Sequence, residues 1–378
     1  MDRLIAELDP DGEVRDFVKQ AIRAVPRHLF IPTVGLISPR DKTGKAFLID
    51  HSTDPNTWLD TVYSDTSVVT QLNDGTTALS ELEGDYTSSA SAPSTVADLL
   101  DLLDPDPGNR VLEIGTGTGW TAALLLQLVG VHGSVTSIEV DAEIAEQAAK
   151  SLDDAGCHPN LIVGDGTKGH AEHAPFDRVH VTCGIRAVPY AWVEQCRPGA
   201  KIVLPYCPNF GENHSVRLMV LQDGTAVGRF RGFASYMPIR SQRYIPDQPA
   251  RGPRDKHWVT TRIDPRTIAY ASAGADLAIS AITGLSSSSM KDADEDGELF
   301  RMWVSDPTTA YSWAVVEWRP DQEQYSVYQV GDRPVWDEVV DAYFRWVSWG
   351  EPGRDRFGLT ITQEGQQIWL DSPEHVLS

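Results

Sequence analysis

The stretch Val111–Gly119, VLEIGTGTG, decides the fold of this chain. The apolar run RVLEIG predicts a buried strand, and WTAALLLQLVG directly after the glycines predicts an apolar helix. Gly115, Gly117 and Gly119 allow the backbone to turn sharply and to approach a ligand without hindrance from a Cβ atom. The third glycine comes one residue earlier than in the dinucleotide-binding GxGxxG pattern, which argues against NAD as the ligand.

Strands and helices alternate on both sides of this motif. SAPSTVADLLDLL predicts a helix with Ser91 or Ser94 as its N-cap. SVTSIEV, LIVGDG, RVHVTCG and KIVLPY predict strands, which alternate with predicted helices at AEIAEQAAKSLDDAG and YAWVEQCRPG. This alternation predicts an α/β fold with a doubly wound, mostly parallel sheet covered on both faces.

Three acidic residues follow or end the predicted strands, where an open α/β sheet binds its ligands. Glu113 precedes the first glycine by two residues, where its carboxylate can meet a cationic amino-acid group. Glu139 ends the next strand and is placed to accept hydrogen bonds from ribose hydroxyls. Asp165, in VGDG, can accept a hydrogen bond from an adenine amino group.

The order hEhGxGxG, then Glu, then GDG resembles the class I methyltransferases. This resemblance implies S-adenosyl-L-methionine as cofactor and S-adenosyl-L-homocysteine as product. The implied cofactor-binding residues are Glu113, Gly115, Thr116, Gly117, Gly119, Glu139, Val140, Gly164, Asp165, Gly166 and Thr182.

Composition restricts the possible partners. The net charge is −22, without a run of Lys or Arg, which argues against a nucleic-acid substrate. No apolar stretch is long enough to cross a bilayer, and the N-terminus has no secretion signal. The four cysteines lack CxxC spacing and His partners, so we expect a cytoplasmic protein with reduced thiols and no metal site.

Motifs over roughly residues 14–240 resemble the protein L-isoaspartyl O-methyltransferases. They include VPRHLFIP, SASAPSTVADLL, APFDRVHVTCG and VPYAWVEQCRPGAKIVLP. The resemblance implies that Ser91, before Ala92-Pro93, is the active-site serine that orients the acceptor carboxylate. It also implies substrate-binding roles for Tyr63, Asp65, Ser88, Ser89 and Ala90.

Two departures from the family pattern bear on the substrate. TQLNDGTTALSELEGDYTSSAS replaces a short glycine-rich loop and places Ser88 where glutamine is expected, and the chain continues beyond the usual end of the fold. Both features resemble a subset of the family found in bacterial ribosomal-peptide pathways. That subset esterifies an Asp side chain of a macrocyclic precursor peptide, made by an ATP-grasp ligase (graspetides) or a lanthionine synthetase (lanthipeptides), and the ester collapses to an aspartimide.

The pattern predicts two domains, a catalytic domain over 1–245 and an α+β extension over 246–378 that is a candidate for substrate recognition. SQRYIPDQPARGPRDK predicts a polar connector and LSSSSMKDADEDGE a mobile loop. Five strands and the helix VWDEVVDAYFRWVSWG follow from Leu299 onward. The tryptophans of this region predict either a packed core or an aromatic surface that holds a peptide.

Alternative functions remain open at this point. One is a general isoaspartyl repair methyltransferase, which would accept short unrelated peptides. A second is a noncatalytic peptide-binding protein with a methyltransferase core, which the intact acidic and glycine motifs argue against. A nucleic-acid methyltransferase is a distant third, disfavoured by the charge.

Overall fold

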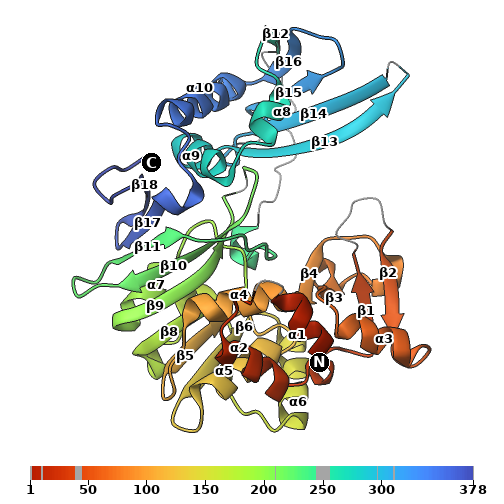
Figure 1. Ribbon diagram of the computed structural model, residues 1–378, viewed down its shortest axis with the longest axis vertical. Helices are drawn as coiled ribbons and strands as arrows, with labels where there is room; N and C mark the ends of the chain where they lie inside the picture. The colour runs from red at the N-terminus through yellow and green to blue at the C-terminus, as the bar shows by residue number, and fades with distance from the viewer. Residues whose placement is uncertain are drawn as a thin grey trace. The chain divides into compact units, whose positions relative to one another are not determined.

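The structure is a computed structural model that describes residues 2–9, 12–38, 45–208, 210–243, 256–295, 297–309 and 311–377 (Figure 1). The α-helices in these ranges are α1 (Asp2–Leu8), α2 (Asp16–Ala24), α3 (Pro55–Val62), α4 (Pro93–Leu103), α5 (Trp120–Val129), α6 (Ala142–Asp154), α7 (Tyr190–Glu194), α8 (Pro265–Ala269), α9 (Ala273–Thr283) and α10 (Val335–Ser348). The first strands are β1 (Val34–Ile37), β2 (Phe47–Asp50), β3 (Val68–Leu72), β4 (Tyr86–Ala90), β5 (Arg110–Ile114), β6 (Ser134–Glu139), β7 (Asn160–Val163), β8 (Phe176–Val181) and β9 (Cys196–Tyr206). The remaining strands are β10 (His214–Val220), β11 (Ala226–Phe230), β12 (Lys256–Thr261), β13 (Ser286–Asp294), β14 (Gly297–Ser305), β15 (Trp313–Trp318), β16 (Tyr325–Val330), β17 (Phe357–Thr362) and β18 (Gly365–Leu370).

The predicted parallel α/β sheet is confirmed. The strand order is β18-β17-β11-β10-β9-β8-β5-β6-β7, and the five strands β5 to β9 pair in parallel with one another. Val111 of β5 pairs with Val135 of β6 on one side and with Arg178 of β8 on the other. The order reverses at β5, since β6 and β8 flank it, and a ligand site is expected at such a switch point.

Contacts between Cα atoms divide the chain into two compact units. Unit 1 comprises residues 1–184, 189–205 and 217–226, and unit 2 comprises 185–188, 206–216 and 227–378. Residues 206–216 and 227–245 therefore cluster with unit 2, although the sequence pattern assigns them to the catalytic domain. The functional boundary at residue 245 stays a prediction.

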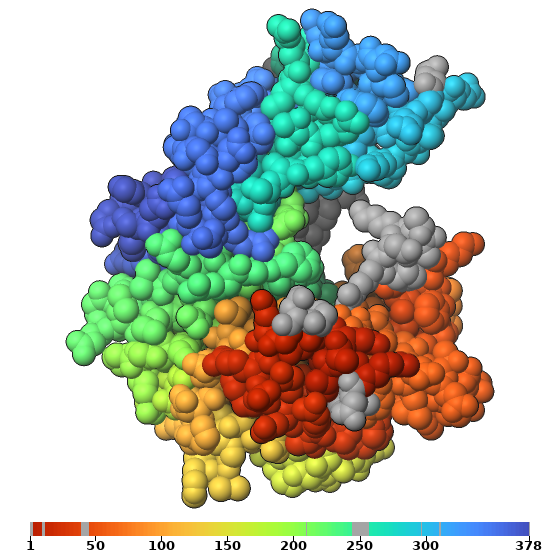
Figure 2. Space-filling view, viewed as in Figure 1, coloured from red at the N-terminus to blue at the C-terminus, as the bar shows by residue number. Residues whose placement is uncertain are grey.

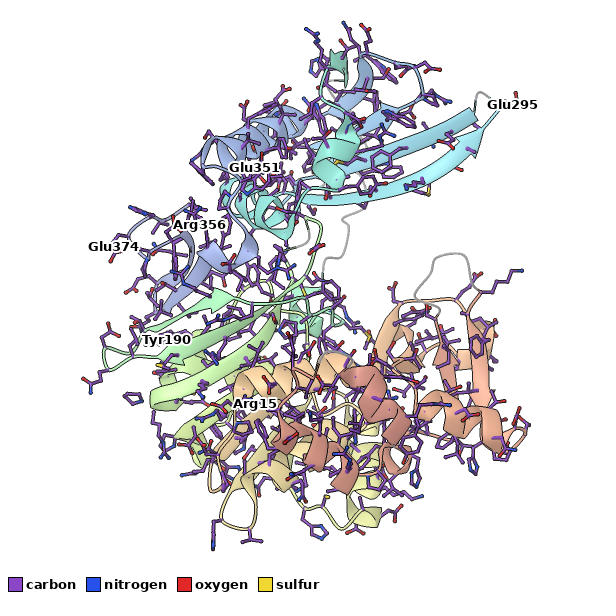
Figure 3. All side chains as sticks on the ribbon, viewed as in Figure 1. Arg15, Tyr190, Glu295, Glu351, Arg356 and Glu374 are labelled. Atoms are coloured by element: carbon purple, nitrogen blue, oxygen red, sulfur yellow. The ribbon has the colours of Figure 1, made fainter. Side chains whose placement is uncertain are left out.

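Unit 1 also contains a small antiparallel sheet, in the order β2-β1-β3-β4, where the sequence predicts irregular structure with short strands. Its core includes Ile37, Ile49, Trp58 and Val68. Arg15, directly before α2, links this helix to α4. Its guanidinium forms ion pairs with Asp101 and Asp104 at 2.6 and 2.5 Å (Figure 3). Figure 2 shows α1 and α2, in red, at the surface of this unit.

The predicted N-cap of α4 is wrong. Ala92 occupies the N-cap position, and neither Ser91 nor Ser94 caps the helix with its side chain. Asp65, distant in sequence, instead accepts hydrogen bonds from the Ser94 backbone N–H and hydroxyl, both at 2.9 Å. A carboxylate at a helix N-terminus satisfies a free donor and is favoured by the helix dipole.

Unit 2 is built on a five-stranded antiparallel sheet in the order β12-β16-β15-β14-β13. Its core consists of side chains from β14, β15 and β16 packed against α8, α9 and α10, among them Phe300, Val316, Val327 and Trp336. The strands predicted from Leu299 onward and the helix α10 are confirmed. The connector predicted from Ser241 lies largely outside the described residues.

The mobile loop predicted at residues 285–298 is wrong. The described residues of this range form β13 and the first two residues of β14, with Ser286 pairing with Ser305 and Asp294 with Gly297. Glu295 lies at its tip (Figure 3). Serines and charged residues have low strand propensity, so the pairing depends on the apolar strand β14 rather than on β13 itself.

Candidate active site

The predicted cofactor residues lie at, or directly after, the carboxyl ends of four neighbouring strands in unit 1. The backbone N–H of Gly115, after β5, donates to Ile138 of β6 at 2.8 Å. The N–H of Thr182, after β8, donates to Ile114 of β5 at 3.0 Å. The four loops after β5, β6, β7 and β8 are thus brought to one edge of the sheet, as the sequence predicts.

The glycine loop has the close packing that its sequence requires. Gly115, Gly117 and Gly119 all have positive φ, at 93°, 53° and 89°. A Cβ atom on Gly115 would lie 2.6 Å from Oγ1 of Thr182 and 2.8 Å from Sγ of Cys183. Larger residues are therefore excluded by both conformation and space.

Glu139 binds the backbone of this loop. Its carboxylate accepts hydrogen bonds from the N–H of Gly117 at 3.0 Å and of Asp141 at 3.1 Å. Only 8% of Glu139 is exposed. This arrangement places an acidic group at the end of β6, directly under the loop where ribose hydroxyls are expected.

The loops after β6 and β7 are open to solvent. Val140 is exposed, and the space that a Cβ on Gly164 would occupy has no neighbouring atom. The Asp165 carboxylate accepts hydrogen bonds from the Thr167 N–H and hydroxyl, which hold its pKa below the usual value. In contrast, Gly166 is buried, and its carbonyl oxygen accepts a hydrogen bond from the Trp192 indole N–H.

Glu113 differs from the other predicted cofactor residues. It is completely buried; one carboxyl oxygen accepts a hydrogen bond from Ser137 at 2.5 Å and the other has no hydrogen-bond partner. Thr116, also buried, bonds the same Ser137 hydroxyl at 2.6 Å. Burial raises the pKa of Glu113 to about 8, the Ser137 hydrogen bond opposes this rise, and the charge of Glu139 adds to it. Contact with a cationic ligand group stays a prediction for Glu113.

The residues of these loops fit a nucleoside ligand. The positive-φ glycine loop admits close approach of a ligand, Glu139 supplies a carboxylate acceptor, and the β7 loop is open beside it.

Among the described residues, no three His, Cys, Asp or Glu side chains form a group that could hold a metal ion. In the same ranges, no helix is long and apolar enough to cross a membrane.

Among the predicted acceptor residues, Ser89 lies against the cofactor loop. β4 ends at Ala90, directly before Ser91, and the Ser89 carbonyl oxygen is 3.6 Å from the position of a Cβ on Gly117. Ser89 and Ser91 are partly exposed. In contrast, Ala90 is packed in the core, and the buried Ser88 hydroxyl accepts a hydrogen bond from Thr70 at 3.0 Å. Ser88 and Ala90 therefore point their side chains into the protein interior.

Tyr63 and Asp65 lie on the segment between α3 and β3. The Tyr63 hydroxyl is 2.6 Å from Nδ1 of His28, and burial raises the pKa of Tyr63. Asp65 binds the start of α4 and so fixes the turn that carries Ser91. The described contacts of Asp65 are thus with the protein itself, and its substrate contact stays a prediction.

Arg27 is the residue that sequence reasoning missed. Its side chain is fully buried and donates to the carbonyl oxygens of Val62 at 2.7 Å and of Thr66 and Ser91 at 2.9 Å. Its guanidinium also lies 5.4 Å from the ring centre of Trp120, the first residue after the glycine loop. The sequence signal was present in VPRHLFIP, but nothing local showed which groups Arg27 contacts.

Comparison with known proteins identifies the family of this chain. Residues 61–243 match the family "Protein-L-isoaspartate(D-aspartate) O-methyltransferase (PCMT)". Protein-L-isoaspartate O-methyltransferase 2 of Archaeoglobus fulgidus is 30% identical over 246 residues, which cover 64% of this chain and 93% of that protein. The Methanopyrus kandleri enzyme is 39% identical over 154 residues, but the match spans only 39% of this chain and 66% of that protein.

A solved protein-L-isoaspartate O-methyltransferase structure shares the fold with a TM-score of 0.56 at 21% identity. The match covers 98% of this chain and 99% of the other. An extension beyond the catalytic fold is therefore found in a protein bearing the family's name. The chain belongs to the protein-L-isoaspartate O-methyltransferase family, which comprises S-adenosylmethionine-dependent carboxyl methyltransferases.

Proposed function

We propose that this chain methylates the free carboxylate of an L-isoaspartyl residue in peptides and proteins. The observation that carries the proposal is the contact between the acceptor strand and the cofactor loop, where the Ser89 carbonyl reaches the surface of Gly117. Ser91 follows Ser89 by two residues, and its hydroxyl is the proposed hydrogen-bond donor to the acceptor carboxylate.

The chemistry requires few polar side chains. A carboxylate with a pKa of about 4 is already ionised at neutral pH, so no general base is needed. Bound S-adenosylmethionine would supply an activated methyl group. A carboxylate oxygen would form a bond to the methyl carbon while the bond between that carbon and sulfur breaks. Ser91 would donate a hydrogen bond that orients the carboxylate, and Arg27 would hold the Ser91 backbone in place. The products are a methyl ester and S-adenosylhomocysteine.

The ester reacts further without the enzyme. The backbone amide nitrogen of the next residue attacks the ester carbonyl and expels methanol, which closes a succinimide ring. Mass spectrometry should therefore detect a gain of one methyl group followed by loss of methanol. A peptide with an ordinary aspartyl residue at the same position is the matched control.

A second candidate is a dedicated maturation enzyme that esterifies an Asp side chain of a ribosomally made macrocyclic peptide. The segment between β3 and β4 favours this candidate, because internal hydrogen bonds and packed leucines give the segment a defined structure. The Asn73 side chain bonds both Thr77 and the Asp85 N–H at 2.8 Å, and Leu79 and Leu82 pack on a small core. A fixed structure beside β4 suits one partner better than many unfolded sequences.

The extension does not separate these candidates, because the solved family structure matches the whole chain. A direct competition does. Equal amounts of a linear isoaspartyl peptide and an Asp-containing macrocyclic peptide, made by an ATP-grasp ligase or a lanthionine synthetase, would be offered together. Preferential methylation of the linear peptide supports the repair activity, and preferential methylation of the macrocycle supports the dedicated enzyme.

A further inference from the structure

The five-stranded sheet of unit 2 has one covered face and one aromatic face. Met302, Val304, Val316 and Val327 are at most 1% exposed and belong to the core beneath the helices. Neighbouring residues along each strand point to the opposite side of the sheet. That opposite side carries large aromatic residues that are only partly buried.

The register aligns these residues in one row across the sheet. Trp303 pairs with Ser288 and Val315, Val315 pairs with Tyr328, and Tyr328 pairs with Trp258. Directly paired residues of antiparallel strands lie on the same face. The row therefore runs from β13 to β12 in the order Ser288, Trp303, Val315, Tyr328 and Trp258; with Trp313, we call it the aromatic row.

The side chains of the aromatic row contact one another and remain accessible. The ring centres of Trp258 and Tyr328 are 4.8 Å apart, and those of Trp313 and Tyr328 are 5.5 Å apart. Trp258 is 73% exposed, and Trp303, Trp313 and Tyr328 are partly exposed. Exposed aromatic clusters of this kind mark interaction surfaces more often than chance placement.

A pocket adjoins the β13 end of the aromatic row. Its volume is about 430 Å³, and it is lined by Gly211, Asn213, Ser286, Ser287, Ser288, Trp303 and Ser305. All of these residues belong to unit 2. β13 is an edge strand of this sheet, so its outer backbone groups have no neighbouring strand in the described sheet. The pocket thus offers hydroxyl groups, an indole wall and a strand edge together.

We infer that the aromatic row and the β13 edge bind an extended, uncharged segment of the peptide substrate that does not include the methylated residue. An extended peptide can pair with the strand edge through its backbone while alternate side chains lie on the sheet face or in the pocket. This inference rests on the proposed action on peptides. The aromatic row and the β13 edge thus contribute to the affinity for the peptide and take no part in the methyl transfer.

Charge supports a peptide over a nucleic acid. Arg301 and Glu317, which flank the aromatic row on the same face, pair with each other at 2.7 Å. Arg319 likewise pairs with Asp294. The protein carries a net charge of −22, and phosphate binding requires an excess of positive charge. Arg301 and Arg319 are thus each paired with a carboxylate, and the stacked rings between the strands suit aromatic and aliphatic side chains.

The test uses the full-length chain and two isoaspartyl peptides. One is short, and the other has the same centre with added flanks rich in Phe, Tyr and Thr. The extended peptide should have the lower KM. Trp258→Ala and Trp303→Ala should each raise its KM about tenfold, as for an interface hot spot, with kcat and the short-peptide KM unchanged. Phe344→Ala is the matched control, since Phe344 is an aromatic residue of α10 in the same unit that is 53% exposed.

A binding assay separates failure of this inference from failure of the proposed function. Fluorescence anisotropy of the labelled extended peptide requires no turnover, so it decides even where neither peptide is methylated. Weaker binding by both tryptophan variants, but not by Phe344→Ala, supports the inference. Unchanged peptide binding by both tryptophan variants overturns the inference. It is also overturned if the wild-type chain binds a labelled single-stranded DNA, or associates with itself, and both variants abolish that binding or self-association.

Discussion

Replacing Arg27 by lysine should damage catalysis more than cofactor binding. Lysine retains the positive charge but lacks the planar fork that reaches Val62, Thr66 and Ser91 at once. If one of the three hydrogen bonds survives, two carbonyl groups that are buried or part-buried lose their donor. At about 1–3 kcal/mol for each such group, the free energy of unfolding should fall by about 2–6 kcal/mol.

The catalytic effect follows from the Ser91 carbonyl. Without the Arg27 donor, the turn that carries Ser91 is still held by the bonds of Asp65 to Ser94 but can shift relative to the glycine loop. A displacement of the reacting groups by about 1 Å can cost a factor of about 100 in rate, so kcat should fall at least about tenfold. Affinity for S-adenosylmethionine, measured by calorimetry, should change little, because Arg27 makes none of the contacts around Glu139.

Arg178→Lys is the matched control. Arg178 is also buried and donates to backbone carbonyls, but at the opposite end of α4, where it binds Leu103 and Asp104. Both variants should lose stability in urea denaturation, and only Arg27→Lys should lose turnover under conditions where both are fully folded. Normal turnover by Arg27→Lys, or an equal loss in both variants, would refute a positioning role for Arg27.

Three further substitutions test the site. Glu139→Ala should weaken S-adenosylmethionine binding by about 1–3 kcal/mol, since hydrogen bonds to a charged group are lost, and calorimetry showing unchanged affinity removes Glu139 from the ribose role. Ser91→Ala should reduce methyl transfer more than cofactor binding; wild-type turnover with only a lower Tm would contradict its role in orienting the acceptor. Glu113→Gln tests the buried acid, whose pKa is raised to about 8. The folded wild-type chain keeps the Glu113 proton up to about pH 8, whereas the unfolded chain releases it near pH 4.5. The free energy of unfolding of the wild type should therefore fall, relative to Glu113→Gln, by up to about 1.4 kcal/mol per pH unit as the pH rises toward 8. Parallel stability curves for the cofactor-free proteins would contradict the raised pKa.

The parallel sheet and the cofactor loops could be predicted because their signals are local. Apolar runs such as RVLEIG form buried strands, and the positions of Gly115 and Gly119 show directly where the backbone adopts positive φ. Carboxyl ends of parallel strands meet at one edge, so their neighbouring loops follow from the fold. Family resemblance then supplied the acceptor residues around Ser91.

The features that could not be predicted depend on contacts between distant segments. Asp65, rather than a serine of the helix itself, binds the start of α4, and Arg27 reaches carbonyls far along the chain. The sequence predicts a loop in place of β13, because β13 is rich in serine and charge and pairs with β14 only in the folded sheet. The tryptophans divide between core positions, such as Trp336, and the open sheet face, such as Trp303, and only the strand register assigns them.

The central claim is that this chain esterifies an isoaspartyl carboxylate. The most direct measurement incubates the full-length protein and S-adenosylmethionine with two linear peptides that differ only in carrying L-isoaspartate or L-aspartate at one position. Mass spectrometry should show a gain of one methyl group, and then loss of methanol, on the isoaspartyl peptide alone. Absence of any methyl ester on that peptide, with cofactor binding verified by calorimetry, would contradict the claim.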